Sequence, residues 1–346
     1  MKLQKFALGL FVVVMVFGLL YVGRSLLIPL VLAFFIWYLI NTLRVLFERI
    51  RLAGRRAPEW LSLIMASLLI LGALGFVLDM VTRNLAQVVS QAPSYQVNLN
   101  ILLEKAWMLA GRSDSPRIEQ FFAGLDLSEL LSTAASTLAG FVGSAGFIIV
   151  LMFFIFLEQR YFRTKLLGMI PDPEDQDETE RLVERIDSDV RTYIGVKSLV
   201  SLMTATFSYI PMKWVGLDFA EFWAVMIFIL NFIPSLGSLI ATVLPTLMAL
   251  VQFNTLGPIL TIGLGIGTVQ LIIGQFLDPR LTGQSLNLSP LAIILSLTLW
   301  GMLWGIAGMF LCVPITVVVM IIFSHFEATR PVAMLLSQKG RLHDPD

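Results

Sequence analysis

The sequence predicts an all-α, polytopic integral membrane protein with 8–10 hydrophobic helices, some of them broken or re-entrant. Three observations predict this class. Of the 346 residues, 57% are hydrophobic and only 14% are charged, and the mean hydropathy is +0.84. Soluble domains carry about 25% charged residues. This chain therefore lacks the polar side chains that would cover a soluble globular enzyme in water.

Runs of uncharged, apolar residues divide the chain into predicted helices. A helix needs roughly 20 apolar residues to cross a hydrocarbon core about 30 Å thick. The first run follows Lys2 and Lys5, as in a signal peptide, but no small-x-small cleavage pattern comes after it, so we expect a retained span. The predicted segments are 6–23, 25–41, 60–82, 136–157, 193–212, 219–233, 236–253, 256–277, 289–305 and 308–324.

The distribution of positive charge predicts the orientation of these segments. With the N-terminus inside, 17 of the 24 basic residues fall on the inner side and six on the outer side, while Lys197 lies within a span. Loops on the cytoplasmic side of a membrane carry an excess of Lys and Arg. We therefore expect a multi-pass protein of the bacterial cytoplasmic (inner) membrane with both termini in the cytoplasm.

The alternation of polar and apolar stretches predicts six regions along the chain. The two hydrophilic stretches are read as helical because their apolar residues recur at helical spacing. The expected regions are N-terminal membrane helices (1–82), an extracytoplasmic helical cap (83–135), a membrane helix (136–157), a cytoplasmic amphipathic helix (158–192), a C-terminal membrane core with broken helices (193–330) and a cytoplasmic tail (331–346).

The predicted cytoplasmic stretch 158–192 contains residues typical of the start of a helix. Asp172 followed by Pro173 is typical of an N-cap with proline at the first helical position. The acid–base pairs Asp177–Arg181 and Asp187–Arg191 are four residues apart. We expect one helix that runs directly into the segment at 193–212. It either couples cytoplasmic movement to the membrane core or is a solvated helix end that shields the inner mouth.

Two apolar segments are interrupted by helix-breaking residues. Segment 219–233 gives about 22 Å of helix at 1.5 Å per residue, short of a full span. It ends at Asn231-Phe-Ile-Pro234-Ser235-Leu-Gly237, where proline removes a backbone donor and glycine loosens the chain. A similar break is expected at 301–308. Broken helices are tolerated only against protein or a water-filled cavity, and they commonly form transporter binding sites.

Only two charged residues lie between positions 222 and 324. Asp278 and Arg280 flank Pro279 in a predicted turn at 278–283. A charge at mid-span costs about 2.5–3.5 kcal/mol on translocon scales. The pair is either a gate that contacts a polar substrate or proton, or a cytoplasmic turn where such charges are cheap.

Amides and glycines are the other unusual residues of the apolar core. Gln270, Gln275 and Asn231 either hold helices together or line a pathway. The glycines at 263–267 lack dinucleotide spacing and predict close helix packing, as do Gly301 and Gly305.

Several functions have no support in the sequence. A formal net charge of zero gives no case for nucleic acid as a partner. The single cysteine, Cys312, and the histidines His325 and His343 match no disulfide or metal-ligand pattern. Walker, His-Glu-x-x-His and Gly-x-Ser-x-Gly motifs are absent from the sequence. We therefore expect no cofactor, no metal site and no enzyme activity.

Three ordered blocks resemble the autoinducer-2 exporter family of bacterial membrane proteins. They begin at Leu230-Asn-Phe-Ile-Pro-Ser-Leu-Gly, at Leu277-Asp-Pro-Arg-Leu-Thr-Gly and at Leu299-Trp-Gly. The resemblance implies an inner-membrane permease without an ATPase, assembled as a homo-oligomer, with pentamers known in the family. Some relatives export autoinducer-2, and others exchange sodium or lithium for protons.

The sequence and the resemblance together predict a secondary transporter of a small polar molecule embedded in the lipid bilayer. An autoinducer-2-like quorum-sensing signal is the favoured substrate, with Na⁺ or H⁺ as a candidate coupling ion. The alternatives are a sodium(lithium)/proton antiporter, in which Asp278 titrates, and a non-transporting membrane scaffold. The residues expected to form the substrate pathway or gate are Asn231, Pro234, Ser235, Gly237, Gln270, Gln275, Asp278, Pro279, Arg280 and Gly283.

Overall fold

The computed structural model describes the chain as a set of helices that divide into two compact units. The described residues are 2–49, 51–52, 55–80, 82–84, 127–253, 255–282, 287–338 and 340. Unit 1 comprises Met1–Ser67, Ser144–Gly195 and Thr282–Asp346, and unit 2 comprises Leu68–Gly143 and Val196–Leu281.

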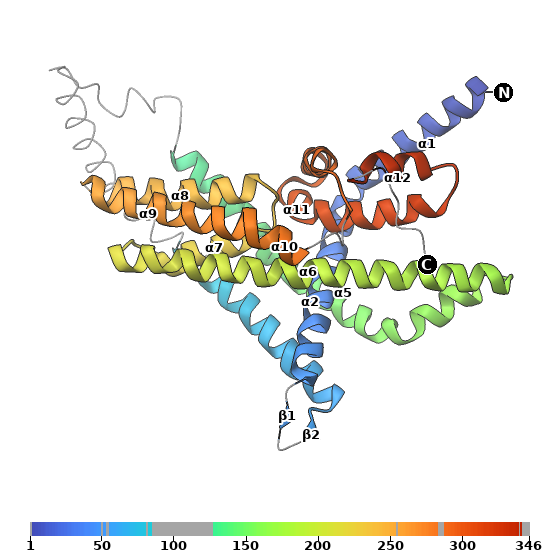
Figure 1. Ribbon diagram of the computed structural model, residues 1–346, viewed down its shortest axis with the longest axis horizontal. Coiled ribbons are helices and arrows are strands. Elements are labelled where there is room, and N and C mark those ends of the chain that lie inside the picture. The colour runs from blue at the N-terminus through green and yellow to red at the C-terminus, as the bar shows by residue number, and fades with distance from the viewer. Residues whose placement is uncertain are drawn as a thin grey trace. The chain divides into compact units, whose positions relative to one another are not determined.

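Helices account for nearly all of the described chain, which confirms the predicted all-α class (Figure 1). A pair of two-residue antiparallel strands, β1 (Arg51–Leu52) and β2 (Arg55–Arg56), follows the second helix. The helices are α1 (Lys2–Val22), α2 (Arg24–Glu48), Glu59–Asn84, α5 (Leu127–Gly168), α6 (Pro173–Val215), α7 (Ala220–Leu230), α8 (Leu236–Gln252), α9 (Leu256–Gln270), the π-helix η1 (Leu271–Leu277), α10 (Asp278–Thr282), α11 (Pro290–His325) and α12 (Arg330–Leu336).

Each predicted apolar segment overlaps one or two of these helices. Among the described helices, five are long and apolar enough to cross a membrane, and Ala7–Val22 of α1, α7 and α8 are shorter apolar helices. Helix α5 is longer than the predicted segment 136–157 at both ends. Most of the predicted cap, residues 85–126, lies outside the described part of the chain.

Helix α6 confirms the predicted continuous helix and its start signal. The backbone N–H of Glu174 donates to the Asp172 carboxylate at 3.0 Å, as an N-cap requires. From Pro173 the helix runs without interruption to Val215 (Figure 1). Arg191 pairs with Asp187 at 2.7 Å, whereas Arg181 donates to the main-chain carbonyl of Asp177.

Unit 1 contains the second predicted break, at Gly305 of α11. Gly305 has φ 62° and ψ −140°, a conformation open almost only to glycine, so the helix bends sharply there. The two arms of α11 meet through a hydrogen bond between the buried hydroxyls of Ser296 and Thr316. Gly301 fits the packing prediction, because an added Cβ would lie 3.0 Å from Met309 Cε. The packing role predicted for Gly305 is wrong: a Cβ there would meet open space, and its backbone conformation is what requires glycine.

Side-chain contacts hold α11 to its neighbours in unit 1. The Trp304 indole N–H donates to the Leu20 carbonyl at 3.0 Å. Phe310 meets Phe35 of α2 edge to face, with ring centroids 4.9 Å apart. At the start of α11, the Ser289 hydroxyl caps the helix by accepting from the Ala292 N–H. These contacts fix the bent helix against α1 and α2.

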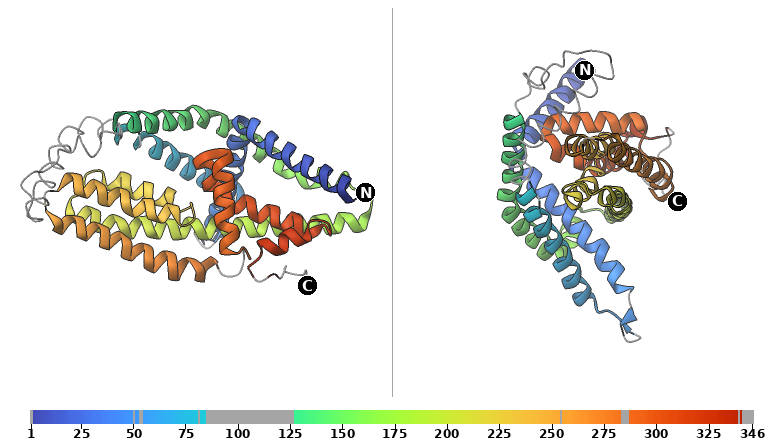
Figure 2. Two further views of the ribbon diagram at one scale, coloured as in Figure 1. Left: turned by 90° about the horizontal axis from the view of Figure 1, so that it is seen from above. Right: turned by 90° about the vertical axis from the view of Figure 1, so that its left-hand side faces the viewer.

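Unit 2 is built around four helices in which each chain neighbour runs antiparallel to the last. The Asn231 amide at the end of α7 bonds to Ser201 of α6, and Gln252 at the end of α8 bonds to both Gly216 and Asp218, just before α7. Helices α8 and α9 lie side by side in the views of Figures 1 and 2. These contacts define an up-down bundle of the second half of α6 with α7, α8 and α9.

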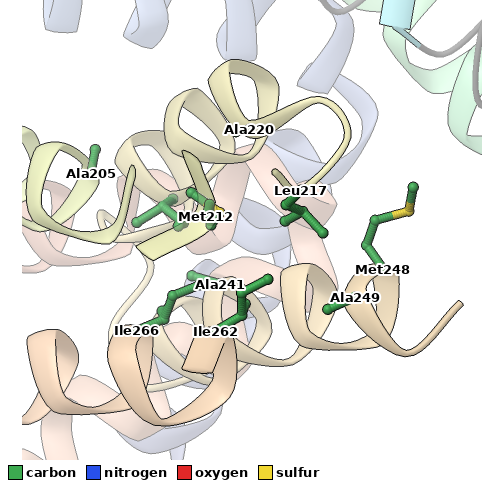
Figure 3. Close-up of a cluster of buried hydrophobic side chains, with 10 residues drawn as sticks. Ala205, Met212, Leu217, Ala220, Ala241, Met248, Ala249, Ile262 and Ile266 are labelled. Atoms are coloured by element: carbon green, nitrogen blue, oxygen red, sulfur yellow. The ribbon is translucent and has the colours of Figure 1, made fainter. Parts of the chain in front are cut away.

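Apolar side chains from all four helices fill the bundle. Figure 3 shows Met212, Leu217, Ala241, Ile262 and Ile266 between the helices, and several members of the cluster are fully shielded from solvent. Glycines of α9 let the helices approach closely: a Cβ at Gly265 would lie 3.0 Å from Pro211 Cβ, and one at Gly263 would lie 3.2 Å from Thr246 Cγ2. The packing role predicted for these two glycines is confirmed, whereas the same role predicted for Gly267 is wrong, because a Cβ there would meet no atom within 4 Å. The buried cluster consists of Ala205, Met212, Leu217, Ala220, Ile227, Ala241, Met248, Ala249, Ile262 and Ile266.

Candidate functional site: a shielded ion pair beside a broken helix

A polar stripe runs along the part of α6 that belongs to unit 2. Its members recur at spacings of four, three and four residues, which places them on one helix face. Ser201, Thr204 and Ser208 are fully buried, and only 13% of the Lys197 side chain is exposed. The stripe therefore faces protein along its whole length. Its members are Lys197, Ser201, Thr204 and Ser208.

The charged member of the stripe forms an ion pair with the acid that the sequence singles out. Lys197 Nζ lies 2.8 Å from Asp278 Oδ2, and the two side chains are 13% and 22% exposed. Shielding from solvent strengthens the attraction between the charges but also removes their hydration. Lys197, which the sequence places within a predicted span, is thus a paired residue.

The broken helix contributes the next polar contact along the stripe. Asn231 is 7% exposed, and its side-chain N–H donates to Ser201 Oγ at 3.1 Å. Beyond it, Ser235 adopts φ 57° and ψ −54°, which breaks the helical path before α8 begins. Pro234 is half-buried in this turn, and its carbonyl accepts from the Leu236 N–H. The predicted break is confirmed.

Gly237 is needed for the tightness of this break. A Cβ at this position would lie 1.8 Å from the Leu230 carbonyl oxygen, closer than any atom can come without moving the backbone. The first turn of α8 therefore packs directly against the last turn of α7. This close approach positions Asn231 beside α6.

The turn predicted at 278–283 is wrong for the residues that the structure describes. The π-helix η1 leads into α10, which begins at Asp278, so Asp278, Pro279 and Arg280 are helical. Proline is tolerated in the first turn of a helix because its missing N–H has no partner to lose there. π-Helical turns are frequent at functional sites.

The other predicted site residues fall in two groups. Gln270 is 9% exposed and lies on the buried face of α9, one turn beyond Ile266. Gln275, Pro279 and Arg280 are exposed. Gly283 lies outside the described residues.

Lys197 and Ser201 are the site residues that the sequence analysis did not include. Their partners are 81 and 30 residues away in the chain, so no local pattern reveals the contacts. The spacing of the four polar residues in an otherwise apolar segment was the available signal. In the described part of the chain, no group of three or more His, Cys, Asp or Glu side chains is arranged to hold a metal ion.

This chain combines helices long enough to cross a membrane with a polar stripe beside a broken helix. That combination is typical of membrane transport proteins. Residues 10–328 match the family described as "AI-2E family transporter". Because this match covers nearly the whole chain, the protein belongs to the AI-2E transporter family. The resemblance seen in the three sequence blocks is therefore confirmed.

Relatives in other bacteria extend over most of the chain. A putative transport protein of Haemophilus influenzae is 26% identical over 343 residues, covering 97% of both chains. A putative transport protein of Borreliella burgdorferi is 30% identical over 248 residues, covering 71% of this chain and 68% of the relative. The AI-2 transport protein TqsA of Escherichia coli is 28% identical over 324 residues, covering 92% of this chain and 91% of the relative.

Proposed function

We propose that this chain is a secondary exporter that moves a small polar molecule across the bacterial cytoplasmic membrane. An autoinducer-2-like quorum-sensing signal is the favoured substrate. The observation that carries the proposal is the shielded Lys197–Asp278 pair, which lies on the same face of α6 as the contact to the broken helix. A relative named as an AI-2 transport protein, aligned over 92% of this chain, supports the choice of substrate.

In this mechanism the ion pair is a gate at one end of the unit 2 bundle. Lys197 and Asp278 hold α6 to α10 while they are paired. A polar solute or a proton that interacts with Asp278 competes with Lys197 and shifts the equilibrium toward an open arrangement. Arg280, which is exposed one residue beyond Pro279, offers Asp278 a second cationic partner in that arrangement.

The break between α7 and α8 supplies the movable element. Hinges absorb backbone rotation at a few residues where elements end, and this break occupies the short stretch from Asn231 to Gly237. When the Asn231–Ser201 hydrogen bond opens, the tip of the α7–α8 pair can part from α6. Pro234 and Ser235 set the shape of the tip.

We also propose an oligomeric assembly for the protein and an orientation in the membrane. The family resemblance favours a homo-oligomer, with a pentamer as the favoured state. Both termini are placed in the cytoplasm, and the region around 83–135 on the outer side, on the basis of the distribution of basic residues. The break at 231–237 and the bend in α11 are proposed to be re-entrant.

A sodium(lithium)/proton antiporter is the second candidate. The observation that favours it is that Asp278, a titratable group, is shielded and paired with a lysine. Binding of a cation or a proton at such a carboxylate would release the lysine in the same way. This candidate predicts cation-dependent proton movement without an organic substrate.

Flux measurements in liposomes that contain the purified protein test the proposal. Efflux of autoinducer-2 and the signal of an internal pH dye are measured side by side, with and without a sodium gradient. We expect autoinducer-2 flux that falls at least tenfold in Asp278→Asn and in Lys197→Met. Sodium-driven proton movement without autoinducer-2 flux would establish the antiporter instead. If neither autoinducer-2 nor protons move, a non-transporting scaffold would be favoured.

Variants at a second ion pair of the bundle test whether the loss of any ion pair lowers flux. Lys213 and Glu221 form a pair of nearly the same length, 2.7 Å, at the opposite end of the same bundle, but both side chains are more than half exposed. Lys213→Met and Glu221→Gln are expected to retain wild-type flux. Equal loss of flux in both sets of variants would contradict the gate.

A further inference from the structure

Three buried polar groups in unit 2 have no hydrogen-bond partner among the described residues. They are the side-chain N and O of Gln270, the hydroxyl of Ser208 and the indole N–H of Trp223. Buried polar groups in proteins are paired in the large majority of cases, and an unpaired one is destabilising. Three of them in one small bundle call for a physical explanation.

The helix contacts place these groups at the same depth of the bundle. Gly265 lies opposite Pro211, so Gln270, five residues further along α9, lies level with position 206 of the antiparallel α6. Asn231 lies opposite Ser201, so Trp223, eight residues earlier in α7, lies level with position 209. Positions 206 to 209 cover about 4.5 Å along the helix axis. Ser208 therefore shares one helical turn with both partners.

The same groups lie on faces that point into the bundle. Gln270 follows Ile262 and Ile266 on α9 at intervals of four residues, and both isoleucines belong to the buried cluster. Ser208 lies between Ala205 and Met212 on α6, and both of these also belong to the cluster (Figure 3). The Trp223 side chain packs against the cluster from α7. Three helices thus carry unpaired polar groups on faces that pack against one apolar cluster.

The chemistry of the set suits an uncharged solute. The Gln270 amide offers two donors and an acceptor, Ser208 offers one of each kind, and Trp223 offers a donor beside a flat aromatic face. None of the three side chains carries a charge. Ligand sites for small molecules typically combine apolar walls with a few polar groups of this sort.

We propose that Gln270, Ser208 and Trp223 form a binding site for a small uncharged molecule that carries neighbouring hydroxyl and carbonyl groups. The site deepens the proposed function and rests on it: the solute reaches the interior when the Lys197–Asp278 pair separates. Gln270 hydrogen-bonds the carbonyl and a hydroxyl group of the solute, and Ser208 bonds a hydroxyl group. The Trp223 indole N–H donates to the solute while its ring covers one face of the solute. A sodium ion is a poor fit, because two of the three side chains carry N–H donors and no carboxylate belongs to the set.

Equilibrium binding to the purified protein in detergent tests the site, with autoinducer-2 as the probe and sodium chloride as the ionic comparison. In Gln270→Leu the probe affinity is expected to fall at least tenfold, which corresponds to about 1.4 kcal/mol. Trp223→Phe, which keeps a ring but removes the N–H, and Ser208→Ala are expected to give smaller losses. Thr268→Val and Thr206→Val, which change exposed hydroxyls on the same helices, serve as matched controls and are expected to bind as wild type.

Thermal unfolding separates a binding role from a structural role. Leucine at position 270 removes an unpaired buried amide, so Gln270→Leu is expected to unfold at the wild-type temperature or above it. If Gln270 instead held helices together, the variant would unfold at a lower temperature. Weaker binding of the probe by Gln270→Leu, together with an unfolding temperature no lower than that of wild type, is the result expected of a binding residue.

The outcomes distinguish this site from the gate. In Asp278→Asn the interior is easier to enter, so the apparent affinity for the probe is expected to rise even though flux is lost. If Gln270→Leu binds autoinducer-2 like wild type, the site is wrong while the gate stands. If the wild-type protein binds no autoinducer-2 but responds to sodium chloride, the uncharged class of ligand is wrong. Weaker binding in Gln270→Leu with normal flux in Asp278→Asn overturns the gate alone.

Discussion

The two ends of the unit 2 bundle carry the same kind of ion pair in opposite surroundings. At one end Lys197 and Asp278 lie 2.8 Å apart with side chains 13% and 22% exposed. At the other end Lys213 and Glu221 lie 2.7 Å apart with side chains 60% and 55% exposed. Distance and charge are nearly equal, so exposure is the variable that separates the two pairs.

This difference decides what each pair can do. An exposed pair is weakened by water and salt and contributes little to stability. A shielded pair attracts more strongly, and removing one partner leaves the other charge shielded from water and without that partner. In the proposed gate, this pair is closed while Lys197 and Asp278 are bonded and open when Asp278 has exchanged Lys197 for another partner.

The largest expected effect is a difference in the free energy of unfolding between variants at the two ends of the bundle. Lys197→Met leaves the Asp278 carboxylate shielded and without its lysine, and we expect the free energy of unfolding to fall by about 3 kcal/mol. The measurement is denaturant-induced unfolding in detergent micelles. Lys213→Met, at the exposed end, is expected to cause a far smaller change.

A double variant makes the same comparison stricter. In Lys197→Met/Asp278→Leu both charges are gone, so most of the lost stability is expected to return. The comparison between the ends would fail if Lys213→Met destabilised the protein as much as Lys197→Met, or if the double variant were no more stable than the single one.

The second effect concerns backbone packing at the two ends. Gly237 lies at the break near Asn231, and a Cβ there collides with the Leu230 carbonyl. Gly237→Ala is therefore expected to destabilise the protein by about 2 kcal/mol. Gly257, in the first turn of α9 at the opposite end, has open space around its missing Cβ.

The matched variant Gly257→Ala is expected to leave stability unchanged or slightly raised, because alanine is the better helix former. Thermal unfolding of both variants, followed by circular dichroism, gives the comparison. Equal behaviour of the two would mean that the tight approach at Gly237 is dispensable.

The smallest effect is a pH dependence at the exposed end. The hydrogen bond that Lys213 donates to the Glu221 carboxylate raises the pKa of Lys213 above its ordinary value. A raised lysine pKa contributes stability that is fully present below the ordinary value of about 10.4 and is lost as pH rises through the raised one. The stability difference between wild type and Lys213→Met should accordingly be constant at neutral pH and vanish in strong base. A difference that changes between pH 6 and 8 would show that another group is responsible.

The sequence predicted the parts of the fold that depend on local physics. Uncharged runs predicted the helices, Asp172 and Pro173 the start of α6, and the Pro–Gly pattern the break after Asn231. Each of these signals acts within a few residues, through solvation, capping or a missing backbone donor.

The parts that the sequence did not predict depend on contacts across the chain. Lys197 meets Asp278 only because α6 and α9 pack antiparallel, and nothing near either residue specifies that partner. The expected turn at Asp278 is helical because the π-helix η1 carries the chain into α10, where Pro279 lies in the first turn. Gly305 is required by its backbone conformation rather than by packing, which a residue name alone does not distinguish.

A charge swap tests most directly whether the Lys197–Asp278 pair is the gate. Autoinducer-2 flux in liposomes is compared for wild type, Lys197→Asp, Asp278→Lys and the variant that carries both substitutions. Each single variant places two like charges together, so flux is expected to fall at least tenfold, and the double variant is expected to recover a substantial part of it. Flux that is normal in the single variants, in protein that is folded and present at wild-type levels, would contradict the gate.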